Sequence, residues 1–264
     1  MDTSAGIALR PSASQLCALN GGDPRVIASA RGFREFLRPP SSVPPQPPRR
    51  SGLAALFGRL TGASTSPESP PSPFPFEHVA ELLRGLMHAM PSSAPRRVAI
   101  AVPAWANDVQ RQQVADGAHT AGWDFLGLVN EPTAAAMASG LLQHGEGTAL
   151  VYDLAEGRFD VTVVAFRGTS FEVLAADGLL KCDDNPTLPE LLARTETPCH
   201  RALAQAGYRS NAIDTVVLVG ETARNPQTVE FVTRLFGQPP LTRFDPEEVV
   251  GFGAAVHASI LESR

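Results

Sequence analysis

The sequence of 264 residues has few cysteines and no excess of positive charge. Its three cysteines, Cys17, Cys182 and Cys199, form no CxxC pair, which argues against a disulfide framework and against a zinc knuckle. The formal net charge of -5 argues against nucleic acid as the main partner, because neutralising phosphates requires a basic surface.

Long hydrophobic runs are also missing. The longest uncharged apolar stretch, residues 249–261, is shorter than the roughly 20 residues that span a bilayer. No basic segment followed by an apolar one comes after Met1, so a secretory signal is not indicated. We therefore expect a cytoplasmic protein that works with neither nucleic acid nor membrane.

A hydrophobic content of 43% and a charged content of 19% are typical of a globular chain. The chain also contains 24 prolines, eleven of which lie between residues 39 and 75. Prolines interleaved with serines lack backbone donors and apolar bulk, so residues 38–75 are predicted to be a flexible loop. Within that loop, residues 45–50 match a PxxPxR ligand pattern that composition alone also explains.

Hydrophobic periodicity divides the rest of the chain into strands and helices, which alternate from residue 97 onward and indicate a layered α/β protein. Strands are expected at 6–9, 15–19, 25–28, 98–102, 125–129, 149–153, 159–166, 170–176 and 215–219. Helices are expected at 76–90, 108–120, 133–142, 189–206, 226–236 and 245–261.

Three turns after predicted strands have residues suited to ligand binding. The turn at 153–160 can present backbone N–H groups to a phosphate, and its Asp153 can hold a hydrated Mg²⁺. Glu131 stands at a strand end, where functional groups of open α/β sheets gather. Residues 216–226 form a strand, a glycine turn and a helix start. Plain structural turns, and a favourable charge at a helix N-terminus for Glu131, explain the same residues.

Taken together and in order, the motifs of this chain resemble those of the ATPase domain of the seventy-kilodalton heat-shock chaperones of the DnaK type, in the actin-like superfamily. The resemblance covers most of residues 5–37 and 76–262. VPAWANDVQRQ at 102–112 resembles VPAYFNDxQRQ, NEPTAAA at 130–136 is intact, YDLAEGRFDV at 152–161 is similar to YDLGGGTFDV, DTVVLVG at 214–220 follows DxVVLVGG, and DPEEVVGFGAA at 245–255 is similar to NPDEAVAxGAA.

This resemblance implies an α/β, actin-like (ribonuclease-H-like) duplicated fold with two lobes, at 1–145 and 146–264. Its small outer subdomains are expected to be reduced or missing, because about a dozen residues separate the strand ending near 176 from the helix near 189. The family places a subdomain that covers the adenine there.

The resemblance also implies a site for ATP or ADP, with Glu131 and Asp153 as relics of the catalytic carboxylates. We assign no metal ligand and do not expect Mg²⁺. The residues implied in cofactor binding are Arg10, Ser12, Asp153, Gly157, Arg158, Gly220, Glu221 and Arg224.

The departures from the family pattern fall in the phosphate loops. Where the family has DLGTT, this chain has Ala8-Leu9-Arg10-Pro11-Ser12, which loses a carboxylate, a glycine and an N–H donor. In the second phosphate loop, glycines become Ala155 and Glu156, and a threonine becomes Arg158. The family's hydrolytic lysine corresponds to Gly58.

These changes lead to the hypothesis that Arg10 and Arg158 fill the phosphate space and pair with Asp153 and Glu131. The competing hypothesis is that the same arginines hold a nucleotide's phosphates without metal. The predicted function is a degenerate nucleotide-binding domain that binds ATP or ADP weakly at best and acts as a chaperone-like or protein-interaction module for an unidentified protein partner. The alternative is an active ATP-hydrolysing chaperone domain. Trp105 and Trp123 are expected to pack in the core or at its boundary.

Overall fold

A computed structural model describes residues 4–9, 13–20, 23–31, 76–139, 145–155, 158–180, 186–241 and 244–263. The predicted loop at 38–75, together with Gly58, lies outside these residues. So do three of the predicted site residues, Arg10, Ser12 and Gly157.

The first half of the chain builds a five-stranded sheet in the order β3-β2-β1-β4-β5. The first three strands are antiparallel, and β4 and β5 run parallel to β1. The strands are β1 (Ser4–Leu9), β2 (Ala13–Asn20), β3 (Asp23–Arg31), β4 (Arg97–Val102) and β5 (Asp124–Asn130). A 3-10 turn, η2 (Phe76–His78), leads into α2 (Val79–Ala89), which with α3 (Asp108–Thr120) covers the outer face.

The second half repeats this plan in a four-stranded sheet of order β8-β7-β6-β9. Leu241 makes a single parallel bridge to Val217 of β9, at the place that the fifth strand holds in the first sheet. The strands are β6 (Glu146–Ala155), β7 (Arg158–Arg167), β8 (Ser170–Leu180) and β9 (Thr215–Val219), and the helices on the outer face are α5 (Leu188–Ala206) and α6 (Pro226–Phe236). The repeated strand order confirms the duplicated actin-like α/β fold.

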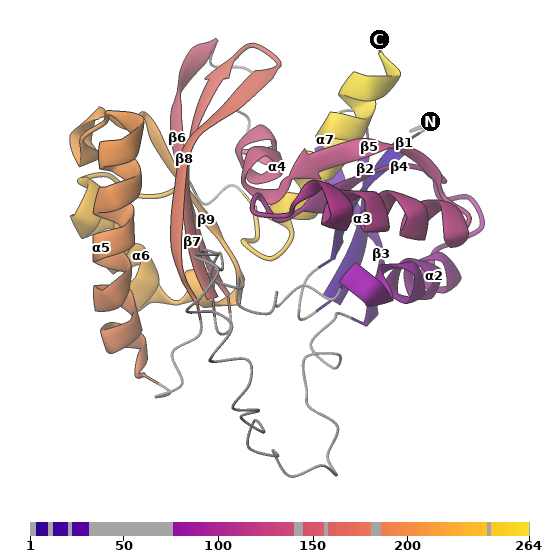
Figure 1. Cartoon of the computed structure of the whole chain (residues 1–264), viewed down its shortest axis with the longest axis horizontal. Coiled ribbons are helices and arrows are strands. Elements are labelled where there is room, and N and C mark those ends of the chain that lie inside the picture. The colour runs from indigo at the N-terminus through magenta and orange to yellow at the C-terminus, as the bar shows by residue number, and fades with distance from the viewer. Residues whose placement is uncertain are drawn as a thin grey trace, which may run out of the picture.

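Two helices, α4 (Glu131–Ala138) and α7 (Val249–Glu262), lie between the two sheets (Figure 1). Glycine and alanine let them approach closely: a Cβ on Gly253 of α7 would lie 1.7 Å from the backbone oxygen of Ala134 in α4. A Cβ on Gly6 of β1 would likewise lie 2.0 Å from the nitrogen of Ala255. The small residues of α4 and α7 therefore set how near the central helices lie to each other and to β1.

The helices and strands form two groups, one around each sheet, which we call lobe A and lobe B. Lobe A is the five-stranded sheet with α2, α3, α4 and α7, and lobe B is the four-stranded sheet with α5 and α6. The predicted boundary at residue 145 stays a prediction, and α7, which lies beyond it in the sequence, packs on β1 of lobe A.

Most predicted elements agree with the structure to within a few residues, and capping explains one of the agreements that hold at both ends. The helix expected at 108–120 has those bounds because the Asn107 side chain accepts a hydrogen bond from the Gln110 N–H, and the Gln110 side chain accepts one from the Asn107 N–H. Only residues 181–187 separate β8 from α5, which agrees with the expected lack of a subdomain at that point.

Three predicted helix starts were wrong. The helix expected from residue 76 begins at Val79, because Phe76–His78 form the 3-10 turn η2. The last helix was expected from residue 245 but begins at Val249, because Asp245 and the three residues after it form a turn in which the Asp245 side chain accepts from the Glu247 N–H. Helix α4 begins at Glu131 rather than 133, because Pro132 is accommodated in the first turn, where its missing N–H has no partner to lose.

We predict that Gly253→Val destabilises the protein by about 3 kcal/mol, the upper end of the usual cost of overpacking, because its side chain would meet the α4 backbone. The matched control is Gly85→Ala in α2, where an added Cβ meets no atom within 4 Å. That change should stabilise the protein by about 0.5–1 kcal/mol through helix propensity. Urea unfolding of both variants measures the difference, and equal effects would contradict the proposed close contact.

Candidate functional site

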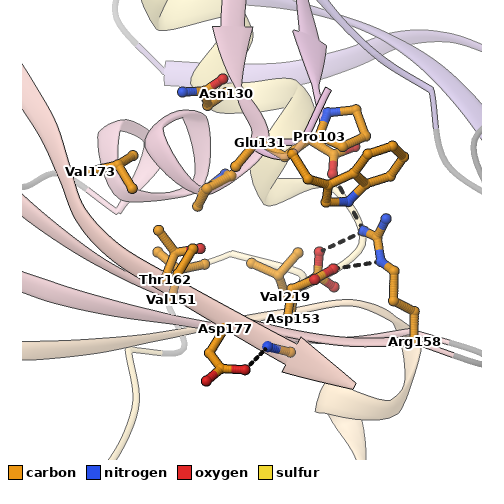
Figure 2. Close-up of a pocket in the computed structure, with 16 residues that line it drawn as sticks. Pro103, Asn130, Glu131, Val151, Asp153, Arg158, Thr162, Val173, Asp177 and Val219 are labelled. Carbon is orange, nitrogen blue, oxygen red and sulfur yellow. Dashed lines mark hydrogen bonds and ion pairs between the residues drawn. The ribbon is translucent and has the colours of Figure 1, made fainter. Parts of the chain in front are cut away.

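A cavity of about 390 Å³ lies between the two sheets (Figure 2). Lobe A contributes Pro103 and Trp105 after β4 and Glu131 at the start of α4. Lobe B contributes Asp153 from β6 and Arg158 from β7. The cavity therefore brings together Glu131, Asp153 and Arg158, three of the residues predicted to form the site.

One face of the β6–β7 hairpin forms part of the wall from lobe B. Asp153 and Asp160 are directly paired across these strands, and Arg158 stands two residues before Asp160 on the same face. Two carboxylates placed opposite each other repel, so this face needs a cation nearby. Arg158 supplies it from the adjacent position.

The guanidinium of Arg158 contacts three carboxylates. Its Nε lies 2.6 Å from Asp160 Oδ2, and its Nη2 lies 3.6 Å from Glu131 Oε2 and 3.9 Å from Asp153 Oδ2. The pairing of Arg158 with Asp153 and Glu131 was anticipated from the sequence. The closest partner, Asp160, was not included among the predicted site residues, although strand alternation places it on the same face.

Trp105 forms the aromatic part of the wall. Its ring centroid lies 5.8 Å from the Arg158 guanidinium carbon, within the range of a cation–π contact, and 6.0 Å from the Phe76 ring in an edge-to-face arrangement. Trp123 is buried as expected and donates its indole N–H to the backbone oxygen of Leu83. Trp105 is 40% exposed and packs on Phe76 at the edge of the core, which is within the expected core or boundary packing. Its contact with Arg158 was not predicted.

Arg111 of α3 positions the lobe A side of the site. Its Nη2 donates to the side-chain oxygen of Asn130 at 2.8 Å, and its Nε donates to the backbone oxygen of Ala106 at 2.9 Å. Asn130 directly precedes Glu131, and Ala106 directly follows Trp105. One side chain thereby ties together the two segments that face Arg158.

In the third predicted loop, Val219 lines the cavity and Gly220 packs against the hairpin. Gly220 has a φ of 95°, and a Cβ there would lie 2.5 Å from the Leu154 oxygen and 3.0 Å from Asp153 Oδ1. Only glycine fits this position without displacing the hairpin. The adjacent 3-10 turn, η5 (Glu221–Arg224), carries Glu221 and Arg224, and neither residue lines the cavity.

Arg224 is held by other carboxylates. Its guanidinium pairs with both oxygens of Asp245 and lies 2.9 Å from Glu247. Close to this cluster, burial and the neighbouring charge of Asp245 raise the pKa of Glu248. A role of Arg224 and Glu221 in nucleotide binding therefore remains a prediction from the sequence.

Asp177 of β8 is a further cavity residue that the sequence reasoning missed. Hydrogen bonds from Arg201 of α5, at 2.6 and 2.9 Å, lower the pKa of the Asp177 carboxyl. Nothing in the local sequence marks this residue, because Arg201 is far from it along the chain and approaches it only when α5 packs on β8.

The amino-acid sequence of this chain is similar to those of known proteins. A family model described as Hsp70 protein matches residues 79–182 and 186–264, which is more than half of the chain. The chain belongs to the Hsp70 family. It is 34% identical over 226 residues to the chaperone protein HscA of Escherichia coli (strain K12 / DH10B), and this match covers 62% of the chain and 37% of that protein.

A second Hsp70 relative is the chaperone protein HscA homolog of Pseudomonas fluorescens (strain SBW25), which is 32% identical over 224 residues. That match covers 61% of this chain and 36% of the relative. The chain thus spans little more than a third of the length of the curated Hsp70 relatives that it matches.

The Hsp70 fold implies ATP with Mg²⁺, and the described residues of the cavity do not fit that metal. Mg²⁺ requires oxygen ligands at about 2.0–2.1 Å in octahedral geometry. Here Arg158 holds a positive charge against Asp160, Asp153 and Glu131, three of the carboxylates that line the cavity. Within the described ranges, no group of three histidine, cysteine or acidic side chains could hold a metal ion.

No described helix is both long enough and apolar enough to cross a membrane.

The Asp177–Arg201 pair gives a pH-dependent prediction. Because the folded-state pKa of Asp177 is lowered from its usual 3.8, the pair stabilises the fold above that value, and this stability is lost as the pH falls through the folded-state pKa. Arg201→Gln should raise the Asp177 pKa toward 3.8 and lower the Tm at neutral pH but not in strong acid.

An NMR titration of the Asp177 carboxyl, with the Tm followed against pH, measures both effects. Arg167→Gln is the control, because the exposed pair of Arg167 with Glu146 lies at the other end of the sheet. An unchanged Asp177 pKa in Arg201→Gln would contradict the assignment.

Proposed function

We propose that this chain is an Hsp70-type nucleotide-binding domain in which an internal ion-pair cluster takes the place of Mg²⁺-ATP. In this proposal it binds ATP or ADP weakly at best and acts as a chaperone-like or protein-interaction module. The observation that carries the proposal is the Arg158 guanidinium, which lies among Glu131, Asp153 and Asp160.

Charge explains why the arginine accompanies the retained carboxylates. Glu131 and Asp153 are both buried, and Asp160 is paired across the hairpin with Asp153. Buried carboxylates of like charge require a cation close by. A guanidinium stays protonated at every relevant pH, so Arg158 supplies this charge permanently, whereas a metal ion would bind reversibly.

Three further losses reduce what the domain can do with a nucleotide. In the first phosphate loop, Arg10 and Pro11 replace residues that would let the backbone approach phosphate, and Gly58 stands where the family has its hydrolytic lysine. The short connection of residues 181–187 leaves no subdomain to cover an adenine. Each lost group that would stabilise charge in a transition state commonly costs about 2.7–4 kcal/mol.

The alternative function is an active ATP-hydrolysing domain. It is favoured by the carboxylates Glu131, Asp153 and Asp160, which are all present, and by the open volume of about 390 Å³ beside them. An intermediate possibility is that a nucleotide binds without metal, with arginines contacting its phosphates. Both alternatives require Arg158 to leave its present partners.

Calorimetry with ATP and with ADP, each with and without Mg²⁺, separates these functions. We expect flat titrations, or weak binding that does not depend on Mg²⁺, and no release of phosphate. Micromolar binding that requires Mg²⁺, together with phosphate release, would establish the active domain instead.

The variant Asp153→Asn adds a second test. If the domain is active, this change abolishes Mg²⁺-ATP binding. In our proposal it alters only stability, by less than the roughly 3–5 kcal/mol that an unpaired buried charge costs, because Asp160 remains 2.6 Å from Arg158. Asp124→Asn, which removes an exposed partner of Arg97, is the matched control and should change neither binding nor stability measurably.

The proposed function also includes a protein partner and a location in the cell. Because the relatives are named as chaperones, we propose that a protein partner in the cytoplasm uses this domain.

A further inference from the structure

Arg158 also joins the two lobes. It stands on β7 of lobe B, and two of its contacts belong to lobe A: Glu131 at the start of α4, at 3.6 Å, and the ring of Trp105 after β4, at 5.8 Å. Figure 2 shows its side chain reaching from the hairpin toward Glu131. Its shortest contact, with Asp160, lies within lobe B and holds the side chain in this direction.

The chain crosses between the lobes at only a few points, so a side-chain contact between the lobes can affect their separation. The chain passes from lobe A to lobe B after α4 and returns before α7. Besides these two connections, α4 packs against the four-stranded sheet between the layers. The contacts of Arg158 lie at the cavity between the lobes, so they act on the separation of its two walls.

The environment of Arg158 makes the contact stronger than an ordinary surface pair. The side chain of Arg158 is 15% exposed and that of Glu131 is 6% exposed, so solvent and salt screen their attraction only partly. The pair of Arg167 and Glu146 on the same hairpin is 85% and 71% exposed, which makes it a weak interaction.

We propose that Arg158 is a latch between the lobes, with Glu131 and Trp105 as its receiving residues, that keeps the cavity closed without any nucleotide. Hydrogen bonds from Arg111 to Asn130 and Ala106 hold the segments that carry both receiving residues. The lobe separation is then set by a side chain of the protein and does not require a ligand. This inference is independent of whether a nucleotide binds weakly or not at all.

The test measures the distance between the lobes in the absence of nucleotide. Spin labels are placed at Gln113→Cys on α3 and at Thr197→Cys on α5, two exposed positions on the outer helices of the two lobes. The background carries Cys182→Ser, and Cys17 and Cys199 are retained because they are buried. Pulsed electron resonance then gives the distribution of distances.

We expect a narrow distribution for the native latch, and a broader one shifted to longer distances for Arg158→Thr. Arg167→Thr, which breaks an exposed pair within lobe B, should leave the distribution unchanged. The intrinsic fluorescence should also change in Arg158→Thr, because Trp105 loses the guanidinium beside its ring.

Glu131→Gln keeps the proposal testable if Arg158→Thr does not fold. This change weakens the contact with lobe A and keeps the 2.6 Å pair with Asp160 inside lobe B, so it too should broaden the distribution. If every folded latch variant retained the native distribution, the latch would be wrong, and the proposed function would still rest on the calorimetry. Conversely, a broadened distribution together with tight Mg²⁺-ATP binding by the native protein would support the latch and overturn the proposed function.

Discussion

The arrangement of this protein depends on the close approach of α4 and α7 between the two sheets. Gly253 lies so near the backbone of Ala134 that no side chain fits, and Gly6 is equally close to α7. Because interiors are close-packed, this contact determines how α4 lies on lobe A, and α4 in turn packs against the four-stranded sheet. The first residue of α4 is Glu131, so the packing of small residues places a carboxylate within reach of Arg158.

The same scaffold can support different chemistry when the charges on it change. Both repeated sheets of the Hsp70 fold are present in this chain. The carboxylates Glu131, Asp153 and Asp160 stand at the positions where the motifs of the family have them. The new component is a permanent cation on β7. Arg158 compensates the charges of these carboxylates from within the protein.

Local rules account for most of the elements. The buried apolar run of β4, the capping box at Asn107 and the glycine that ends α5 are all readable from neighbouring residues. Predictions failed where a polar side chain competed for the backbone, as at Asp245, or where a residue's surroundings came from distant segments. Trp105 was expected in the core or at its boundary, but its place at the cavity was not predicted, because its neighbours, Phe76 and Arg158, come from other parts of the chain.

The sequence alone determined the family, the duplicated α/β fold and the substitution of arginine for threonine at position 158, because motifs and their order survive as strings of residues. The family motifs already suggested Asp153 and Glu131 as partners of that arginine, and Asp160 was accessible from strand alternation. Tertiary structure decided how closely Arg158 approaches Glu131 and Trp105, because these residues meet only when the lobes pack. It also decided that Asp177 pairs with Arg201, because that contact forms between a strand and a helix. Ion pairs depend on distances of a few ångströms between residues far apart in the chain, and no local pattern encodes those distances.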